Sequence, residues 1–216
     1  MRDKYELQLK QLNDLMIHMG SLIEAAIEMA IEALVKGDAD KAREAVEFDD
    51  TIDQTQKDIE SLCMRILLMQ QPVATDLRFV STALKLVTDM ERIGDHAADI
   101  SEITISHVGS EYVKDLDVIK EMAAKTSGMV IKSVESYVNR NTEEAKEVIA
   151  YDDVIDDLFI RGKDEIVRMI GENPKCGSEA TDLLMIAKYF ERIGDHASNI
   201  AEWALYAKTG DINVIQ

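Results

Sequence analysis

The sequence is short of the residues that interrupt helices. Its 216 residues include only two prolines and ten glycines, and aromatic residues make up 5% of the chain. Proline and glycine are the residues least compatible with a helix interior, so their scarcity permits long uninterrupted helices. Leu, Ile, Ala and 11 Met supply most of the 46% apolar content. This composition predicts an all-α fold.

Other absences exclude classes of protein. The two cysteines, Cys63 and Cys176, do not occupy equivalent positions in the two halves of the chain, so we expect reduced thiols and no disulfide. The N-terminal residues lack the apolar stretch of a signal peptide. The sequence contains no run of about 18 apolar residues, which is the length needed to span a membrane. We therefore expect a cytoplasmic protein with no direct membrane insertion.

The charge is strongly one-sided. Lys and Arg number 24 against 42 Asp and Glu, which gives a formal net charge of −18. Such a surface repels phosphate backbones and anionic lipid headgroups, so it argues against nucleic-acid binding and membrane adhesion. It is better suited to hard cations or to a basic patch on a partner protein.

The sequence contains an internal repeat. The heptapeptide Glu-Arg-Ile-Gly-Asp-His-Ala occupies residues 91–97 and again residues 191–197. The only two prolines, Pro72 and Pro174, lie at the same expected hairpin of each half. We therefore divide the chain into two tandem units, residues 1–108 and residues 109–216.

Apolar residues recur at steps of three and four along most of the chain, which is the period of an amphipathic helix. Six helices are expected, from about residue 12 to 37, 39 to 71, 73 to 107, 116 to 137, 142 to 171 and 178 to 208. Asp38 and Asn141 are suitable N-caps for the second and fifth of these. Short connections require antiparallel packing, so we predict two tandem three-helix bundles related by a pseudo-twofold axis.

Each heptapeptide holds two carboxylates four residues apart, which places them on one face of a helix, where like charges repel. A second acidic pair with the same spacing lies on the preceding helix of each half. The eight residues, four in each half, are Asp49, Asp53, Glu91 and Asp95, and Asp152, Asp156, Glu191 and Asp195. The hairpins allow the two pairs of each half to lie level, so both quartets are candidate metal sites.

An oxygen-rich site of this kind suits iron, manganese, magnesium or calcium and would not strongly select zinc. Gly94 and Gly194 lie between the carboxylates of the two heptapeptides. Each costs about 1 kcal/mol inside a helix. We expect that the missing side chains let a neighbouring chain or a metal cluster come close.

Several alternatives remain open at this stage. Glu91 lies on one apolar stripe of its helix, but a second stripe that includes Met90 and Ile93 could face the core instead, leaving Glu91 and Asp95 at the surface. The acids would then be a solvated face of a metal-free scaffold or an open metal site. For His96 and His196 we favour a structural hydrogen bond over metal ligation.

Two segments resemble the signatures of the PhoU family of phosphate-transport regulators. Residues 77–80 (LRFV) with 90–97 (MERIGDHA) are similar to the first signature, and residues 186–197 (IAKYFERIGDHA) to the second. The resemblance covers essentially the whole chain. It implies two three-helix bundles that bind multinuclear metal clusters, iron above all, through the eight acidic residues. Asn199 stands where the first half has Asp99, so the two clusters need not be equal.

The resemblance also implies a function. PhoU proteins are cytoplasmic, commonly homodimeric, negative regulators of phosphate uptake and of phosphate-starvation signalling. They act through the ATPase of the phosphate ABC transporter and, in many bacteria, through a sensor histidine kinase. We therefore expect a regulator that is not an enzyme and has no catalytic residues. A di-iron oxidase is the rival, but such sites use Glu-x-x-His, and none of the four histidines follows a Glu in this way.

Overall fold

The computed structural model describes residues 2–106 and 117–215, and in these ranges the chain is helical with no strand. The six long helices are α1 (Arg2–Lys36), α2 (Ala39–Gln70), α3 (Thr75–Ser106), α4 (Asp117–Val138), α5 (Thr142–Glu172) and α6 (Gly177–Thr209). Two 3₁₀ turns, η1 (Pro174–Cys176) and η2 (Ile212–Val214), flank α6. The predicted end of the third helix at His107, the start of the fourth at Leu116 and the boundary between residues 108 and 109 lie outside the described residues.

The helix ends follow from local chemistry. Gly37, with a φ of 63°, adopts the left-handed conformation that closes α1. The side chain of Asp38 accepts hydrogen bonds from the backbone N–H groups of Asp40 and Lys41, and so caps α2. Asn141 caps α5 through the N–H groups of Glu143 and Glu144. Both predicted N-caps are therefore confirmed.

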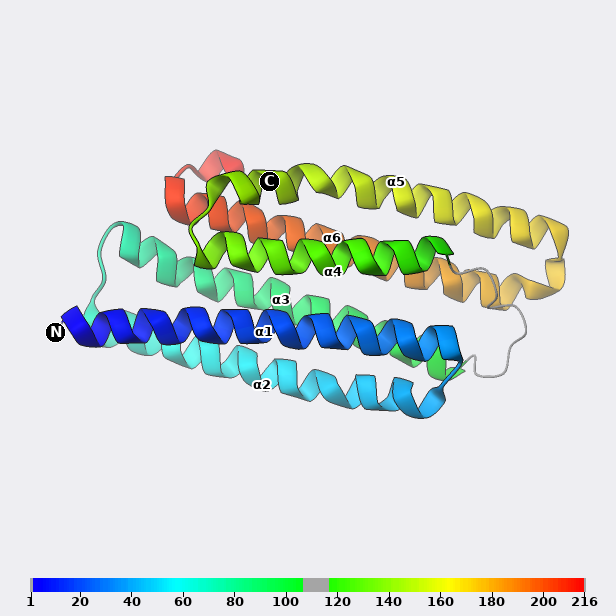
Figure 1. Cartoon of the computed structure of the whole chain (residues 1–216), viewed down its shortest axis with the longest axis horizontal. Coiled ribbons are helices and arrows are strands. Elements are labelled where there is room, and N and C mark those ends of the chain that lie inside the picture. The colour runs from blue at the N-terminus through cyan, green and yellow to red at the C-terminus, as the bar shows by residue number, and fades with distance from the viewer. Residues whose placement is uncertain (1, 107–116, 216) are drawn as a thin grey trace.

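The helices form two three-helix bundles. The first three helices pack against one another, as do the last three, and the bundles meet where α3 packs on α6 and α1 on α4. In Figure 1 the α2–α3 hairpin lies at the left end of the molecule and the α5–α6 hairpin at the right end. The two bundles therefore run in opposite directions, as the predicted pseudo-twofold axis requires.

The core selects one of the two apolar stripes of α3. The stripe of Leu86, Met90, Ile93, Ala97 and Ile100 is fully buried, with 0–2% of each residue exposed. The other stripe is only partly buried at its Leu84, Glu91 and Ala98 positions. The acidic pair of the heptapeptide therefore lies at the rim of the hairpin and not in the core.

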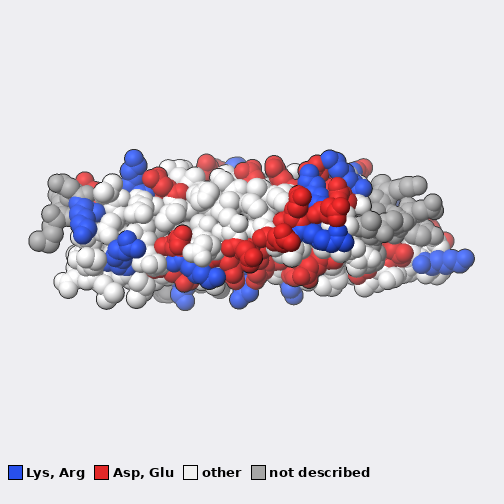
Figure 2. Space-filling view, turned by 90° about the horizontal axis from the view of Figure 1, so that it is seen from below, with Lys and Arg blue, Asp and Glu red and all other residues white. Residues whose placement is uncertain are grey.

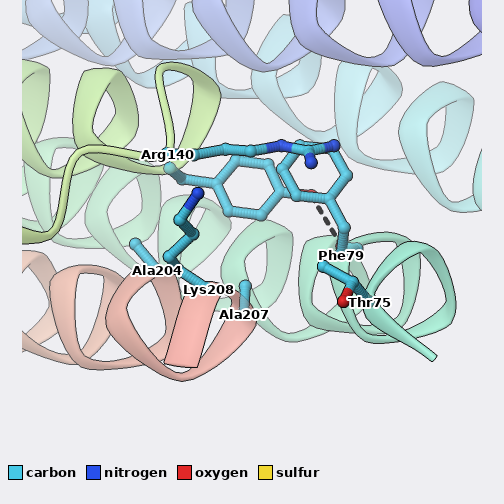
Figure 3. A pocket seen from close by; sticks show the side chains of 7 residues that line it. Thr75, Phe79, Arg140, Ala204, Ala207 and Lys208 are labelled. Atoms are coloured by element: carbon cyan, nitrogen blue, oxygen red, sulfur yellow. Dashed lines mark hydrogen bonds between the residues drawn. The ribbon is translucent and has the colours of Figure 1, made fainter. Parts of the chain in front are cut away.

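One end of the interface between the bundles is closed by an aromatic stack. The rings of Phe79 on α3 and Tyr137 on α4 lie 4.4 Å apart, and the Tyr137 hydroxyl donates a 2.7 Å hydrogen bond to the Phe79 carbonyl oxygen. The guanidinium of Arg140 lies 4.4 Å above the Phe79 ring. Figure 3 shows these side chains around a small cavity, with Lys208 of α6 reaching toward it.

Cys63 and Cys176 are both buried and free, as predicted. Among the described helices, none combines the length and the apolarity needed to cross a bilayer.

Candidate metal centre

The eight predicted acids lie where the two helices of each hairpin face each other. Those of the first quartet come from α2 and α3, and those of the second quartet from α5 and α6: Asp49, Asp53, Glu91 and Asp95, then Asp152, Asp156, Glu191 and Asp195. Figure 2, which views the molecule from the α2 side, shows Asp and Glu gathered in a band across that face. Neither quartet is in the hydrophobic core, so both can be reached by a cation from solvent.

In each quartet, a glycine allows the two helices of the hairpin to approach closely. Gly94 and Gly194 are buried, each facing the neighbouring helix of its hairpin. A Cβ built on Gly94 would lie 2.8 Å from Oδ1 of Asp49, and one built on Gly194 would lie 3.5 Å from Oδ1 of Asp152. The close approach expected from the sequence is therefore present. Each glycine lets a carboxylate of one helix lie against the backbone of the other.

In the second quartet, oxygens of three carboxylates lie close together. Asp156, Glu191 and Asp195 each offer one oxygen, and the three oxygens lie within 4.8 Å of one another. Oxygens bound to one hard cation lie about 2.0–2.6 Å from it, so atoms this close can share an ion. Among the described residues, no other group of three such side chains converges to this degree.

The first quartet is arranged differently. Oδ1 of Asp49 is buried and makes no hydrogen bond to any described residue. A buried carboxylate oxygen without a partner is costly, and a cation is one way to satisfy it. Nη1 of Arg92 lies 2.6 Å from Oδ2 of Asp95, and its Nε lies 3.5 Å from Oε2 of Glu91, so Arg92 offsets part of the negative charge.

Burial and the charges of neighbouring carboxylates make Asp49 and Asp152 harder to ionise. Burial, followed by the charges of Asp95 and Asp53, raises the pKa of Asp49 to about 6. Burial, followed by Asp195 and Asp156, raises the pKa of Asp152 to about 6 as well. Each quartet is therefore electrostatically coupled, and its charge is unfavourable without a counter-ion.

Three more acids show the same effect. Burial is the main cause that raises the pKa of Glu91, Asp156 and Asp195, and the neighbouring carboxylates add to it. The donor set is purely carboxylate, it contains an unsatisfied buried oxygen and the glycines leave room beside it. The residues present therefore fit a hard cation.

Lys188 lies beside the second quartet, and the sequence analysis did not predict a role for it. The ammonium of Lys188 forms an ion pair with both oxygens of Glu191, and it lies 5.3 Å from the centre of the Phe159 ring. The first half has Thr88 at the corresponding position, 100 residues earlier. A residue-by-residue comparison of the two heptapeptide flanks would have exposed this difference.

The two histidines beside the quartets lie at the contact between the bundles, and His196 links one bundle to the other. Nδ1 of His196 lies 2.9 Å from Oδ1 of Asp89 on α3, and Nδ1 of His96 lies 3.4 Å from Oδ2 of Asp99. The two imidazole rings lie 5.5 Å apart across the α3–α6 interface. This is the structural role favoured from the sequence. Asp89, which carries no repeat signal, was not identified there.

Comparisons with known proteins agree with the helical architecture. The sequence model of the PhoU domain matches residues 16–104 and 119–204. The chain is 39% identical to the phosphate-specific transport system accessory protein PhoU homolog of Clostridium acetobutylicum, over 97% of this chain and 96% of that protein. The corresponding homolog of Aquifex aeolicus is 37% identical, over 95% and 93%.

Solved structures of PhoU proteins are also similar to this chain. The crystal structure of PhoU from Pseudomonas aeruginosa superposes with a TM-score of 0.89 at 30% identity, covering 96% of this chain and all of that one. The phosphate transport system regulatory protein PhoU from Streptococcus pneumoniae gives a TM-score of 0.87 at 26% identity, covering 96% and 98%.

Proposed function

This chain belongs to the PhoU family, and we propose that it is a metal-binding, non-enzymatic regulator of phosphate uptake. Relatives that match it along nearly their whole length carry the name of accessory proteins of the phosphate-specific transport system. Membership of this family therefore indicates an accessory role in phosphate transport. We assign no residue a catalytic role, and the histidines nearest the acids are paired with Asp99 and Asp89.

The proposed function also includes specific protein partners. By resemblance, the protein acts in the cytoplasm as a homodimer and restrains the phosphate ABC transporter through its ATPase, with a sensor histidine kinase as a second partner. The strong negative charge supports docking onto basic protein surfaces.

The partner proposal is tested by association with the cognate ATPase. We expect the tagged protein to retain the ATPase from cells grown with abundant phosphate, and to retain it less at high salt because exposed charges are screened. An unrelated acidic helical-bundle protein of similar net charge is the control. Failure to retain the ATPase above that control would contradict the proposed route of regulation.

The metal proposal rests mainly on the convergence of Asp156, Glu191 and Asp195. The first half repeats the acidic residues and their spacing in the sequence. The four acids of each bundle would together hold cations. Iron is the cation implied by the family. Manganese, magnesium and calcium have the same preference for oxygen. A bound cation would supply positive charge that neutralises the carboxylates. The protein's own contribution is to hold α2 against α3 and α5 against α6 at the glycines.

Elemental analysis of protein purified without chelators tests this. We expect the native chain to retain cations, and the Glu91→Gln/Asp95→Asn and Glu191→Gln/Asp195→Asn variants each to lose the share of one quartet. The substitutions keep side-chain size while removing charge. A native metal content no higher than that of a variant carrying all four substitutions would show that the quartets are solvated acids on a metal-free scaffold.

A further inference from the structure

The second quartet has a lysine beside its glutamate that the first quartet lacks. Lys188 lies three residues before Glu191 on α6, where α3 has Thr88 three residues before Glu91. Its ammonium is bound by both oxygens of the Glu191 carboxylate. The second quartet therefore contains a positive charge that the first lacks at this position.

Asp156, Glu191 and Asp195 form the triad of the second quartet, and Lys188 contacts Glu191, its least exposed member. The side chain of Glu191 is 13% exposed and that of Lys188 is 38% exposed. An ion pair that is partly removed from water is stronger than a fully solvated one. The charge of Lys188 also acts against the rise in the pKa of Asp156 and Asp195, so it is felt by all three acids of the triad.

A second difference between the halves accompanies the first. The ammonium of Lys188 lies 5.3 Å from the centre of the Phe159 ring on α5, a cation–π distance. When the halves are aligned on Asp49 and Asp152, Phe159 corresponds to Gln56. The second half thus has both the lysine and the aromatic ring beside it, and the first half has neither.

The first quartet has exposed cations instead. Lys57 on α2 lies 3.6 Å from Oδ2 of Asp53, with 62% of its side chain exposed. Arg92 approaches Asp95 from outside the quartet, with 54% of its side chain exposed. Its equivalent in the second half, Arg192, is present in the sequence as well. Lys188 is therefore an addition to the repeated pattern and not a substitute for its arginine.

We propose that Lys188 is an internal counter-ion of the second quartet, which an incoming metal cation must displace from Glu191. The inference rests on the proposed metal-binding function and deepens it. The oxygens of Glu191 cannot give their full negative charge to the ammonium and to a metal at once. The second quartet consequently binds cations more weakly than it would with the threonine of the first half, and it fills only when metal is more abundant.

The test isolates the second quartet. Mn²⁺ binding is measured by electron paramagnetic resonance of the free ion, in the full chain carrying Glu91→Gln and Asp95→Asn. In this background we compare Lys188 with Lys188→Thr, Lys188→Met and Lys188→Arg. Methionine removes the charge but keeps a long apolar stem beside Phe159, whereas arginine keeps the charge.

Threonine and methionine are expected to tighten Mn²⁺ binding about two- to fivefold, the range of a partly exposed ion pair, and arginine is expected not to. In the reciprocal background, Glu191→Gln with Asp195→Asn, Thr88→Lys should weaken binding at the first quartet by a similar factor. Circular dichroism of each metal-free variant confirms that it is folded.

The two levels of the proposal fail separately. If the background protein binds Mn²⁺ and the threonine and methionine variants bind it no more tightly, Lys188 is only a surface ion pair and the inference is wrong. If the native chain binds no Mn²⁺ at all, the metal-binding function itself is wrong, and the inference falls with it.

Discussion

Alanine in place of Gly94 is expected to destabilise the protein by about 1–3 kcal/mol, the usual cost of overpacking a close contact. In a free helix the same change would stabilise by up to about 1 kcal/mol, because alanine is the better helix former. At Gly94 the new Cβ would lie 2.8 Å from Oδ1 of Asp49 and 3.0 Å from Cδ1 of Ile52. Both α2 side chains must move, and the carboxylate must leave its place in the quartet.

Other glycines of the same chain provide graded controls. Gly128, in the middle of α4, has no atom within 4 Å of a built Cβ, so alanine there should stabilise the protein. Gly194 is intermediate, since its nearest contact would be 3.2 Å to Ile155, and alanine there should be close to neutral.

Urea unfolding of the three variants measures the free energies of unfolding, and Mn²⁺ titration reports on the first quartet. The expected order of stability is Gly128→Ala above Gly194→Ala above Gly94→Ala, with weakened Mn²⁺ binding only where α2 is displaced. Equal stabilisation at Gly94 and Gly128 would mean that α2 and α3 do not approach as closely as described.

The metal-free protein is expected to lose stability as the pH rises from about 4 to about 7, and added Mn²⁺ is expected to reverse the trend. The pKa of Asp49 and that of Asp152 are raised to about 6 in the folded chain. In the unfolded chain an aspartate titrates near 3.9. Stability contributed by protonating these groups is complete below the unfolded pKa and is lost as the pH rises through the folded one.

Cations act in the opposite direction because they bind the ionised quartet. Saturation at about 100 times the dissociation constant would add about 2.7 kcal/mol for each independent site. In a chain of this size that corresponds to a rise of about 5–10 °C in melting temperature per site. The rise should be largest at the high end of the pH range, where no proton competes with the metal.

Thermal unfolding followed by circular dichroism, with a chelator or with Mn²⁺, measures both effects. The Asp49→Asn/Asp152→Asn variant removes the two aspartates whose pKa is raised to about 6, so the difference between native chain and variant isolates them from other titrating residues. A difference that does not change with pH in the metal-free state would show that the two aspartates are solvated and independent.

The sequence by itself determined the helices and the composition of the site. Helix boundaries depend on contacts within a few residues, which is why Gly37, Asp38 and Asn141 could be assigned their roles in advance. The internal repeat identified the eight acids and the two glycines without any knowledge of packing. The same repeat, compared position by position, also contains the difference between Thr88 and Lys188.

Only the tertiary structure decided how those residues face one another. Both stripes of α3 have the apolar character and spacing of a buried face, so the choice between them depends on α1, α2 and α6, which lie far away in the sequence. Residues on a helix are rotated by about 100° from one to the next, so that choice moved Glu91 from the core to the rim. The pairing of His196 with Asp89 and the converging oxygens of the second quartet are likewise contacts between separate helices, which no local pattern can specify.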